Sequence, residues 1–241
     1  MEKLRYKIAE LNVEILHYGE RLKKQAEPYL FNFDGEPDIK IELKKEKIEQ
    51  YLSTHPNLTF DECEYILVGF LFYNKILKFN GILVHSSAVV YKHKAYLFTA
   101  PSGTGKSTHT SLWLENLEDV YILNDDKPAV RVIDGEIFAY GTPFSGKNDI
   151  SRNEKVTLGG IVYVTRGSEN HIFKVNTPQA INILIWQTVK FRSQKTAEYA
   201  LNVISKILSK IKIKQLCCNV SKEAFITSFE DLTNEKYDDT V

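Results

Sequence analysis

The chain lacks the features of secreted, membrane-spanning and disordered proteins. It has 3 cysteines in 241 residues, an odd number without the spacing of a disulfide framework, so reduced thiols are expected. It has no run of the roughly 18 to 20 apolar residues that a membrane-spanning helix needs, and no apolar signal-peptide core near its start. Its 12 Gly and 7 Pro are too few for a collagen-like or low-complexity chain. These absences predict a cytoplasmic protein without a membrane partner.

An excess of charge of either sign is also missing. The 31 Lys and Arg residues balance 31 Asp and Glu residues, which gives a formal net charge of +0. Such a chain is not attracted as a whole to nucleic acid, so no nucleic-acid partner is expected. Hydrophobic residues make up 43% of the chain, which is typical of a folded protein, and the length favours one large domain or a domain with a smaller appendage.

Residues 1–80 are expected to form a strand and helix segment that packs on, or leads into, the main domain. Tyr6–Ile15 and Asp38–Leu43 alternate apolar with polar residues, which predicts half-buried strands. A helix is predicted over Asp61–Phe79, because apolar residues recur there at helical spacing and Thr59 precedes it as an N-cap.

Residues 81–241 are expected to form the main domain. Short polar turns join its predicted strands in pairs, namely 82–91 with 95–99, 129–133 with 136–140, and 160–164 with 171–175. Helices are predicted from Pro178 to Val189 and from Ala200 to Ile211, then a short strand and a last helix that begins at Ser221. Paired strands of this kind predict a mixed α/β fold of the α+β class, with a largely antiparallel or mixed sheet and a helical C-terminal segment.

A glycine-rich turn between a strand and a helix is the most informative segment. The residues expected to surround nucleotide phosphates are Ser102, Gly103, Thr104, Gly105, Lys106, Ser107 and Thr108. Glycines permit positive φ values and a close approach of N–H groups to phosphate, and the following helix adds partial positive charge. Lys106 is expected to reach the β- and γ-phosphates, and Ser107 to bind Mg²⁺. The general pattern begins with Gly where this chain has Ala100, which requires a negative φ there. The alternative is a glycine-rich turn that precedes Lys-Ser by chance.

A pair of acids follows the next apolar strand. Asp125 and Asp126 come after Asn124 and four apolar or aromatic residues. Carboxylates in this place can bind Mg²⁺ and accept a proton from an attacking hydroxyl. The alternative is a solvated acidic turn before Lys127 and Pro128.

Three segments together resemble a known family. The segment from His85 to Val90 (HSSAVV), the loop from Ser102 to Ser107 and the Asn124–Asp126 turn look like the catalytic domain of HPr kinase/phosphorylase, and the loop is similar to that of ATP-dependent phosphoenolpyruvate carboxykinase. The likeness covers about residues 81–175. It implies an ATP- and Mg²⁺-dependent kinase that forms a homo-oligomer and transfers the γ-phosphoryl group to a hydroxyl. The acceptor would be a serine of a protein or peptide, or a small molecule.

The resemblance also implies roles for particular residues. One of Asp125 and Asp126 would deprotonate the acceptor, and the other would hold Mg²⁺ with Ser107. We favour Asp125 as base and Asp126 as metal ligand. His85 would lie beside the γ-phosphate and the acids, and the alternative for this lone histidine is a core residue. Lys106 completes the catalytic set.

Two cations and two other functions complete the expectations. Lys147 and Arg152 follow a second Gly/Ser-rich turn and are candidates for holding the acceptor or the γ-phosphate, or are ordinary surface cations.

A non-catalytic ATP sensor would bind nucleotide through Ser102–Ser107 and signal through residues 1–80. A carboxykinase-type lyase shares the loop, but the chain is short and lacks a convincing array of cations for two anionic substrates.

Overall fold

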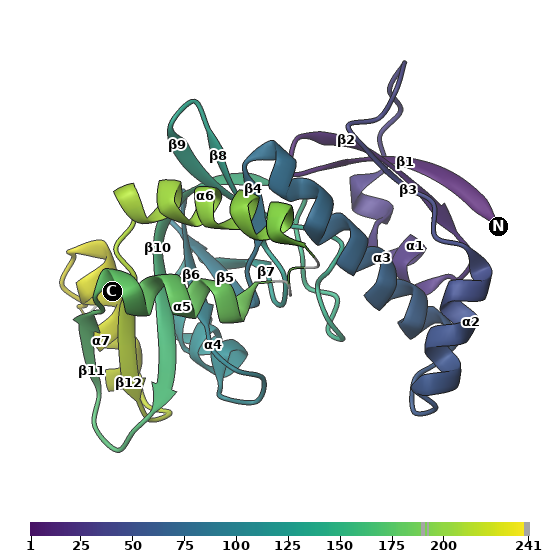
Figure 1. Cartoon of the computed structure of the whole chain (residues 1–241). Coiled ribbons are helices and arrows are strands. Elements are labelled where there is room, and N and C mark those ends of the chain that lie inside the picture. Colours follow the sequence, from purple (N-terminus) through teal and green to yellow (C-terminus); the bar gives the residue numbers. More distant parts are fainter. Residues whose placement is uncertain (189–190, 192, 239–241) are drawn as a thin grey trace.

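The N-terminal segment forms a small sheet with a layer of helices beside it (Figure 1). The computed structural model describes residues 1–188, 191 and 193–238. The strands are β1 (Glu2–Ile8), β2 (Leu11–His17) and β3 (Ile39–Ile41), and the helices are α1 (Arg21–Gln25), α2 (Lys45–Thr54) and α3 (Phe60–Ile76). β1 pairs antiparallel with β2, and β3 pairs parallel with β2. The strand predicted over Asp38–Leu43 is confirmed as β3.

The strand predicted over Tyr6–Ile15 is wrong as a single element. Ala9 and Glu10 have φ values of 50° and 62°, and they turn the chain back into a hairpin. Positive φ at both central residues is the geometry of a type I′ turn, which usually has Asn or Gly. Neither residue is present, so the sequence carried no sign of this turn.

The predicted helix over Asp61–Phe79 is confirmed. Thr59 and Glu62 form a reciprocal capping box at its N-terminus, and α3 passes into a short 3-10 helix at Leu77–Phe79. Asn80 then takes a left-handed conformation with a φ of 52°, which ends the helix. α2 had no counterpart among the sequence expectations, because Ile48 is the only one of its residues that is buried.

The main domain is built on one large mixed sheet. Its strands are β4 (Gly81–Leu83), β5 (Ser86–Tyr91), β6 (Lys94–Thr99), β7 (Tyr121–Asn124), β8 (Ala129–Ile133), β9 (Glu136–Tyr140), β10 (Lys155–Arg166), β11 (His171–Lys174) and β12 (Lys214–Cys218). Within the described residues they follow the order β4-β8-β9-β10-β6-β5-β7, with β12 paired to both β10 and β11. The predicted hairpins β5–β6 and β8–β9 are confirmed, and the expected α+β character of the fold agrees with this architecture.

The predicted hairpin of 160–164 with 171–175 is wrong. β12 runs parallel to β10 and lies between it and β11, so β11 pairs with β12 instead. The first strand of the main domain also divides into β4 and β5, because the backbone leaves the sheet at Val84 and His85.

Helices cover both faces of the large sheet. α5 (Thr177–Gln187) and α6 (Gln194–Lys210) pack on one face through Leu184, Val203 and Ile207. α4 (Lys106–Asn116) and α7 (Lys222–Thr233) pack on the other face, where the buried Trp113 contacts Phe225. The predicted helices are present, but α6 begins at Gln194, six residues before the predicted start at Ala200, with Ser193 as its N-cap. The predicted end of α5 at Val189 lies outside the described residues. Among the described residues, no helix is both long enough and apolar enough to span a bilayer.

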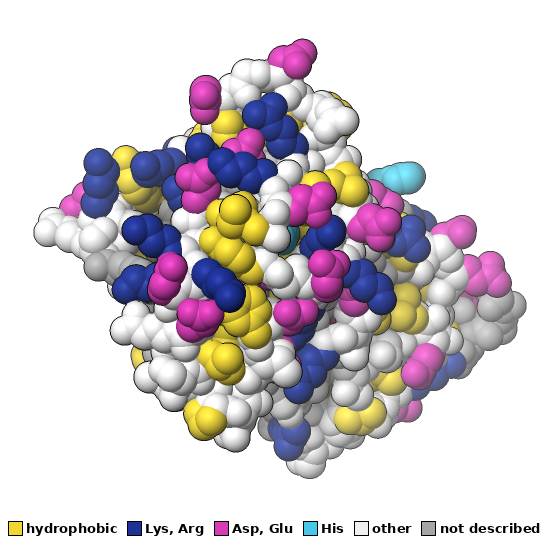
Figure 2. Space-filling model, turned by 90° about the vertical axis from the view of Figure 1, so that its right-hand side faces the viewer, with side chains coloured by type: hydrophobic (Ala, Val, Ile, Leu, Met, Phe, Trp, Pro, Cys, Tyr) yellow, Lys and Arg dark blue, Asp and Glu magenta, His cyan; other side chains and the backbone are white. Residues whose placement is uncertain are grey.

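The N-terminal segment and the main domain share a core. Tyr65 and Phe72 of α3 pack against Phe144, which follows β9. Phe144 is fully buried, so the two segments form one continuous hydrophobic layer at this point. Figure 2 shows that the side of the molecule toward the N-terminal segment carries basic and acidic side chains interspersed with hydrophobic ones.

Candidate functional site

Three strand ends meet at one edge of the large sheet and carry the predicted site. β5 runs antiparallel to both of its neighbours, β6 and β7. Ser86 at the start of β5 therefore pairs with Thr99 at the end of β6, and Ala88 pairs with Asn124 at the end of β7. The glycine-rich loop after β6, the start of β5 and the acid turn after β7 are consequently neighbours.

The glycine-rich loop has the backbone geometry that its sequence predicts. Gly103 and Gly105 have φ values of 76° and 120°, and a Cβ atom at either position would meet nothing within 4 Å. The need for glycine there is thus conformational and not steric. Ala100 is buried and lacks a positive φ, as the departure from the general pattern requires. Lys106 is the first residue of α4, so the free N–H groups of this helix point into the loop.

Lys106 is held against the start of its own loop. It is 8% exposed, and its Nζ donates to the carbonyl oxygens of Ala100 at 3.1 Å and Pro101 at 3.4 Å. Burial lowers the pKa of Lys106, and the nearby charge of Lys127 lowers it further, while the two acids act in the opposite direction. Ser107 and Thr108, by contrast, are exposed in the first turn of α4.

Asn124 shapes the acid turn. Its side chain is fully buried and donates to the carbonyl of Thr142 at 2.8 Å. Its Oδ1 accepts hydrogen bonds from the backbone N–H groups of Asp126 at 3.0 Å and Lys127 at 2.7 Å. This Asx-type turn fixes the directions in which the two carboxylates leave the backbone.

Asp125 is tied to the helix of the glycine-rich loop. Ser87 donates from its hydroxyl to Asp125 Oδ1 at 2.7 Å, and the same hydroxyl lies 2.8 Å from Thr110 Oγ1 of α4. Thr110 is three residues, about one helical turn, beyond Ser107. Asp125 is therefore oriented toward the first turns of α4.

Asp126 belongs to a different set of contacts. Lys127 Nζ donates to its Oδ1 at 2.9 Å, and His85 Nε2 lies 3.4 Å from the same oxygen. Burial, followed by the charges of Lys127 and Lys106, lowers the pKa of His85 to about 4. The imidazole is therefore neutral at pH 7, and its contact with Asp126 is not a pair of opposite charges. Burial also lowers the pKa of Lys127.

A loop over residues 145–151 closes the acid turn from the other side. Asn148 Nδ2 donates to Asp125 Oδ2 at 3.4 Å, and the Asp125 N–H donates to the Ile150 carbonyl at 3.1 Å. Gly146 has a φ of 77°, and a Cβ there would lie 3.2 Å from Asp126 Cβ, so the loop approaches the acid closely.

The N-terminal segment holds this loop in place. Gln25 Nε2 lies 3.0 Å from Ser145 Oγ, from the Gly146 carbonyl and from Asp149 Oδ1. Arg21 also donates to the Gly146 carbonyl, at 3.1 Å. Residues 1–80 are thus part of the support of the site, although they contribute no side chain to the acid turn.

The two cations predicted on the acceptor side contact other groups than the acids. Lys147 is exposed and lies where its charge acts on Glu62 of α3. Arg152 stacks its guanidinium over the Tyr121 ring at 4.1 Å and lies 3.8 Å from Glu154 Oε1. The structure therefore brings Lys106, His85, Asp125 and Asp126 together with the loop. The roles predicted for Lys147 and Arg152 stay predictions.

Two side chains absent from the expectations join the site. Lys127 stands next to Asp126, and Arg166 at the end of β10 donates to the carbonyls of Gly103 at 2.6 Å and Thr104 at 3.2 Å. The sequence could have indicated Lys127, because it comes directly after the acid pair. Nothing local marks Arg166, because β10 comes beside the loop only through its parallel pairing with β6.

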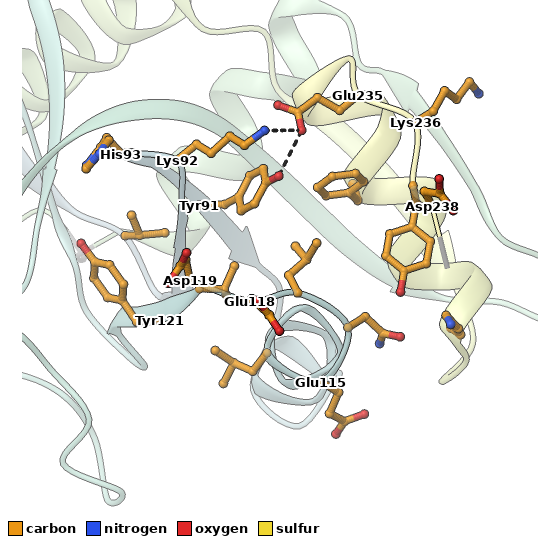
Figure 3. Close-up of a pocket in the computed structure, with 18 of the residues that line it drawn as sticks. Tyr91, Lys92, His93, Glu115, Glu118, Asp119, Tyr121, Glu235, Lys236 and Asp238 are labelled. Atoms are coloured by element: carbon orange, nitrogen blue, oxygen red, sulfur yellow. Dashed lines mark hydrogen bonds and ion pairs between the residues drawn. The ribbon is translucent and has the colours of Figure 1, made fainter. Parts of the chain in front are cut away.

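Two cavities lie near these elements. The larger, of about 1290 Å³, is lined by Tyr91, Lys92, Glu118 and Tyr121 among others, and Figure 3 shows Tyr91 and Lys92 pointing to Glu235 across it. It contains none of the loop or acid residues. The smaller, of about 640 Å³, is bordered by His85 and by Pro101 of the loop, so it is the cavity that adjoins the site.

The donor set suits Mg²⁺ bound together with phosphates. Among the described residues, no group of three or more His, Cys, Asp or Glu side chains forms a protein-only metal site. Mg²⁺ in nucleotide sites needs only one or two carboxylates and a hydroxyl, because phosphate and water supply the other ligands.

Comparison with known protein families finds no family model that matches the chain, and no curated protein matches its sequence.

Proposed function

We propose that this chain is an ATP- and Mg²⁺-dependent kinase that transfers the γ-phosphoryl group to a hydroxyl, as its resemblance to the HPr kinase group implies. The observation that carries the proposal is the convergence of Lys106, Asp125 and Asp126 at the edge where β5, β6 and β7 end. Phosphoryl transfer depends on positioning and on neutralising charge, and this cluster supplies cations, carboxylates and loop N–H groups together. The three free cysteines and the use of ATP both fit the cytoplasmic location expected from the sequence.

The contacts favour a division of labour between the two acids. Asp125 is linked through Ser87 to Thr110 on α4, so it is placed to share a cation with the Ser107 hydroxyl. Mg²⁺ held there would neutralise charge on the phosphates. Asp126 lies 3.4 Å from His85, which borders the 640 Å³ cavity, so we favour Asp126 as the group that takes the proton of an acceptor. This reverses the assignment favoured from the sequence, which stays the alternative.

Variants at the two acids separate these assignments. The protein is incubated with γ-labelled ATP, Mg²⁺ and an extract of the host cell, and the label transferred is measured. Asp126→Asn is expected to abolish transfer and to spare MgATP binding. Asp125→Asn is expected to raise the Mg²⁺ concentration needed for half-maximal transfer. Asp119→Asn, an exposed carboxylate away from the loop, is the matched control. The opposite pattern supports Asp125 as base. Full transfer by both variants contradicts a role of either acid in the chemistry, and absence of transfer by the wild type contradicts the kinase proposal.

A non-catalytic ATP sensor is the second candidate, and one observation favours it. Gln25 and Arg21 connect residues 1–80 to the loop beside the acids, which would let nucleotide binding act on the N-terminal segment. Tight MgATP binding by the wild type without transfer of label to any component of the extract would support the sensor.

A further inference from the structure

The 640 Å³ cavity adjoins the reactive end of the site. His85 forms part of its wall and also lies 3.4 Å from Asp126, and Pro101 at its border accepts a hydrogen bond from Lys106. In phosphate loops the lysine reaches the β- and γ-phosphates. The cavity therefore adjoins the place where the γ-phosphate and an acceptor would meet.

The walls of this cavity combine apolar side chains with polar ones. Tyr163 of β10, Val175, and Ile183 and Trp186 of α5 supply its apolar surface. Among the described residues that line it, none is Asp, Glu, Lys or Arg. A charged group bound there would lose its hydration without gaining a partner, which is costly.

Four amide side chains complete the lining, namely Gln179, Asn182, Gln187 and Gln215. An amide carries a hydrogen-bond donor and an acceptor, which is the combination that peptide N–H and C=O groups require. Part of this capacity is used within the protein: Gln179 Oε1 accepts from the Asn176 N–H at 3.3 Å, Gln215 Nε2 donates to Thr165 Oγ1 at 3.4 Å, and Gln187 hydrogen-bonds to His85. A volume of 640 Å³ lies within the range of about 300–1,000 Å³ typical of small-ligand pockets, so a few peptide residues fit.

One helix provides most of this surface. Gln179, Asn182, Ile183 and Trp186 recur at helical spacing on α5 and face the cavity, while Ala180 and Leu184 of the same helix pack on the sheet. Trp186 is 81% exposed. A large aromatic side chain exposed beside an apolar cavity is typical of a residue that anchors a ligand.

We propose, resting on the kinase function above, that this cavity binds the acceptor and that the acceptor is an uncharged peptide segment in which an apolar residue adjoins the phosphorylated Ser or Thr. The apolar residue packs on Ile183 and Trp186, and the amides pair with the peptide backbone. The acceptor hydroxyl then attacks the γ-phosphorus, and its proton passes to Asp126. The bond between the γ-phosphorus and the β–γ bridging oxygen breaks, and ADP leaves with that oxygen.

The exposed Trp186 makes binding directly measurable. The chain has 2 Trp, and Trp113 is fully buried, so a change in emission on ligand binding reports mainly on Trp186. The probes are the blocked peptides acetyl-Leu-Ser-Leu-amide, acetyl-Glu-Ser-Glu-amide and acetyl-Lys-Ser-Lys-amide, and free serine. Each is titrated into the full chain with Mg²⁺ and a non-hydrolysable ATP analogue. The apolar peptide is expected to shift the emission to shorter wavelength and to bind about tenfold or more tightly than the charged ones.

Variants of the cavity wall then test the assignment through transfer kinetics. Trp186→Ala is expected to raise the KM for the apolar peptide about tenfold, with kcat and the MgATP affinity little changed. Ile183→Glu is expected to abolish binding of the apolar peptide and to favour the lysine peptide. Leu201→Ala removes an exposed apolar side chain of α6 outside the cavity, and it is expected to change neither the KM nor the MgATP affinity.

The outcomes separate this proposal from the kinase function itself. Binding of the apolar peptide at Trp186 without transfer supports the cavity assignment and contradicts the kinase. Equal use of charged peptides or of free serine overturns the assignment even if transfer is efficient. If Trp186→Ala loses affinity for MgATP, and nucleotide alone shifts the emission of the wild type, the cavity binds the nucleobase and its assignment to the acceptor is overturned.

Discussion

Ser87 Oγ lies 2.7 Å from Asp125 Oδ1 and 2.8 Å from Thr110 Oγ1, so one buried hydroxyl of β5 connects the acid turn to the helix that follows the glycine-rich loop. β5 lies between the strand that leads to the loop and the strand that leads to the acids. The Ser87 hydroxyl therefore bridges the acid turn and α4, and it orients the Asp125 carboxylate relative to this helix.

Ser87→Ala is expected to lower the rate of phosphoryl transfer and to raise the Mg²⁺ concentration needed, because Asp125 loses the donor that orients it. The free energy of unfolding should fall by about 1–3 kcal/mol, as for a buried hydrogen bond left incomplete. Ser86→Ala is the matched control, since Ser86 is also buried but its hydroxyl donates to the Val84 carbonyl. Equal kinetic effects of both substitutions would show that the Asp125 contact has no specific role.

Gln25→Ala is expected to reduce transfer without weakening MgATP binding. The substitution removes three contacts to Ser145, Gly146 and Asp149, and so frees the loop that packs against the acids. Lys24→Ala, at the exposed neighbouring position on α1, serves as control. Hydrogen exchange should speed up at residues 145–151 in the Gln25 variant, and unchanged exchange there would rule out this role of the N-terminal segment.

Arg166→Ala is expected to raise the dissociation constant of MgATP roughly three- to tenfold, because the loop must then be ordered by the nucleotide alone. The guanidinium of Arg166 donates to two successive loop carbonyls, those of Gly103 and Thr104. Arg166→Lys keeps the charge but not the paired geometry, and it should lie between the wild type and the alanine variant. An affinity for MgATP unchanged by Arg166→Ala would contradict a role in ordering the loop.

The stability of the fold is expected to fall as the pH is lowered from about 6.5 toward 4. Burial lowers the pKa of His109 from 6.5 to about 4, and the same holds for His17. Between these two values the unfolded chain binds protons that the folded chain does not, so the free energy of unfolding rises with pH in this window. His109 alone contributes at most about 3 kcal/mol.

Urea unfolding at pH 5.0 and 7.5 measures this effect. His109→Gln should narrow the difference between the two unfolding free energies, because one of the buried imidazoles is gone. His171→Gln, at an exposed position, should leave the difference as it is. A wild type with the same free energy of unfolding at both pH values would contradict the lowered pKa values of His109 and His17.

Local signals predicted the elements that form the site. The Asp134–Gly135 turn and the Thr59 capping box lie where the sequence places them, because each depends on residues close together in the chain. The order of strand, glycine-rich turn and helix before the acid turn was equally local. Lys106 and Asp126 come near one another because β5 pairs with both β6 and β7.

Long-range pairing was beyond the reach of the same reasoning. β12 inserts next to β10 from 48 residues further along (214 − 166 = 48), and no pattern within β11 indicates that it pairs with β12. The contact of Gln25 with Ser145 joins positions 120 residues apart. Such contacts depend on tertiary packing, which periodicity and turn chemistry do not encode.

The equilibrium affinity for MgATP, measured by calorimetry on the wild type and on Lys106→Ala, tests the central claim most directly. The account predicts that the wild type binds one MgATP per chain and that Lys106→Ala weakens binding by about a hundredfold or more, since an ammonium group in contact with phosphate is lost. Absence of MgATP binding by the folded wild type, or the same affinity in both proteins, would contradict it.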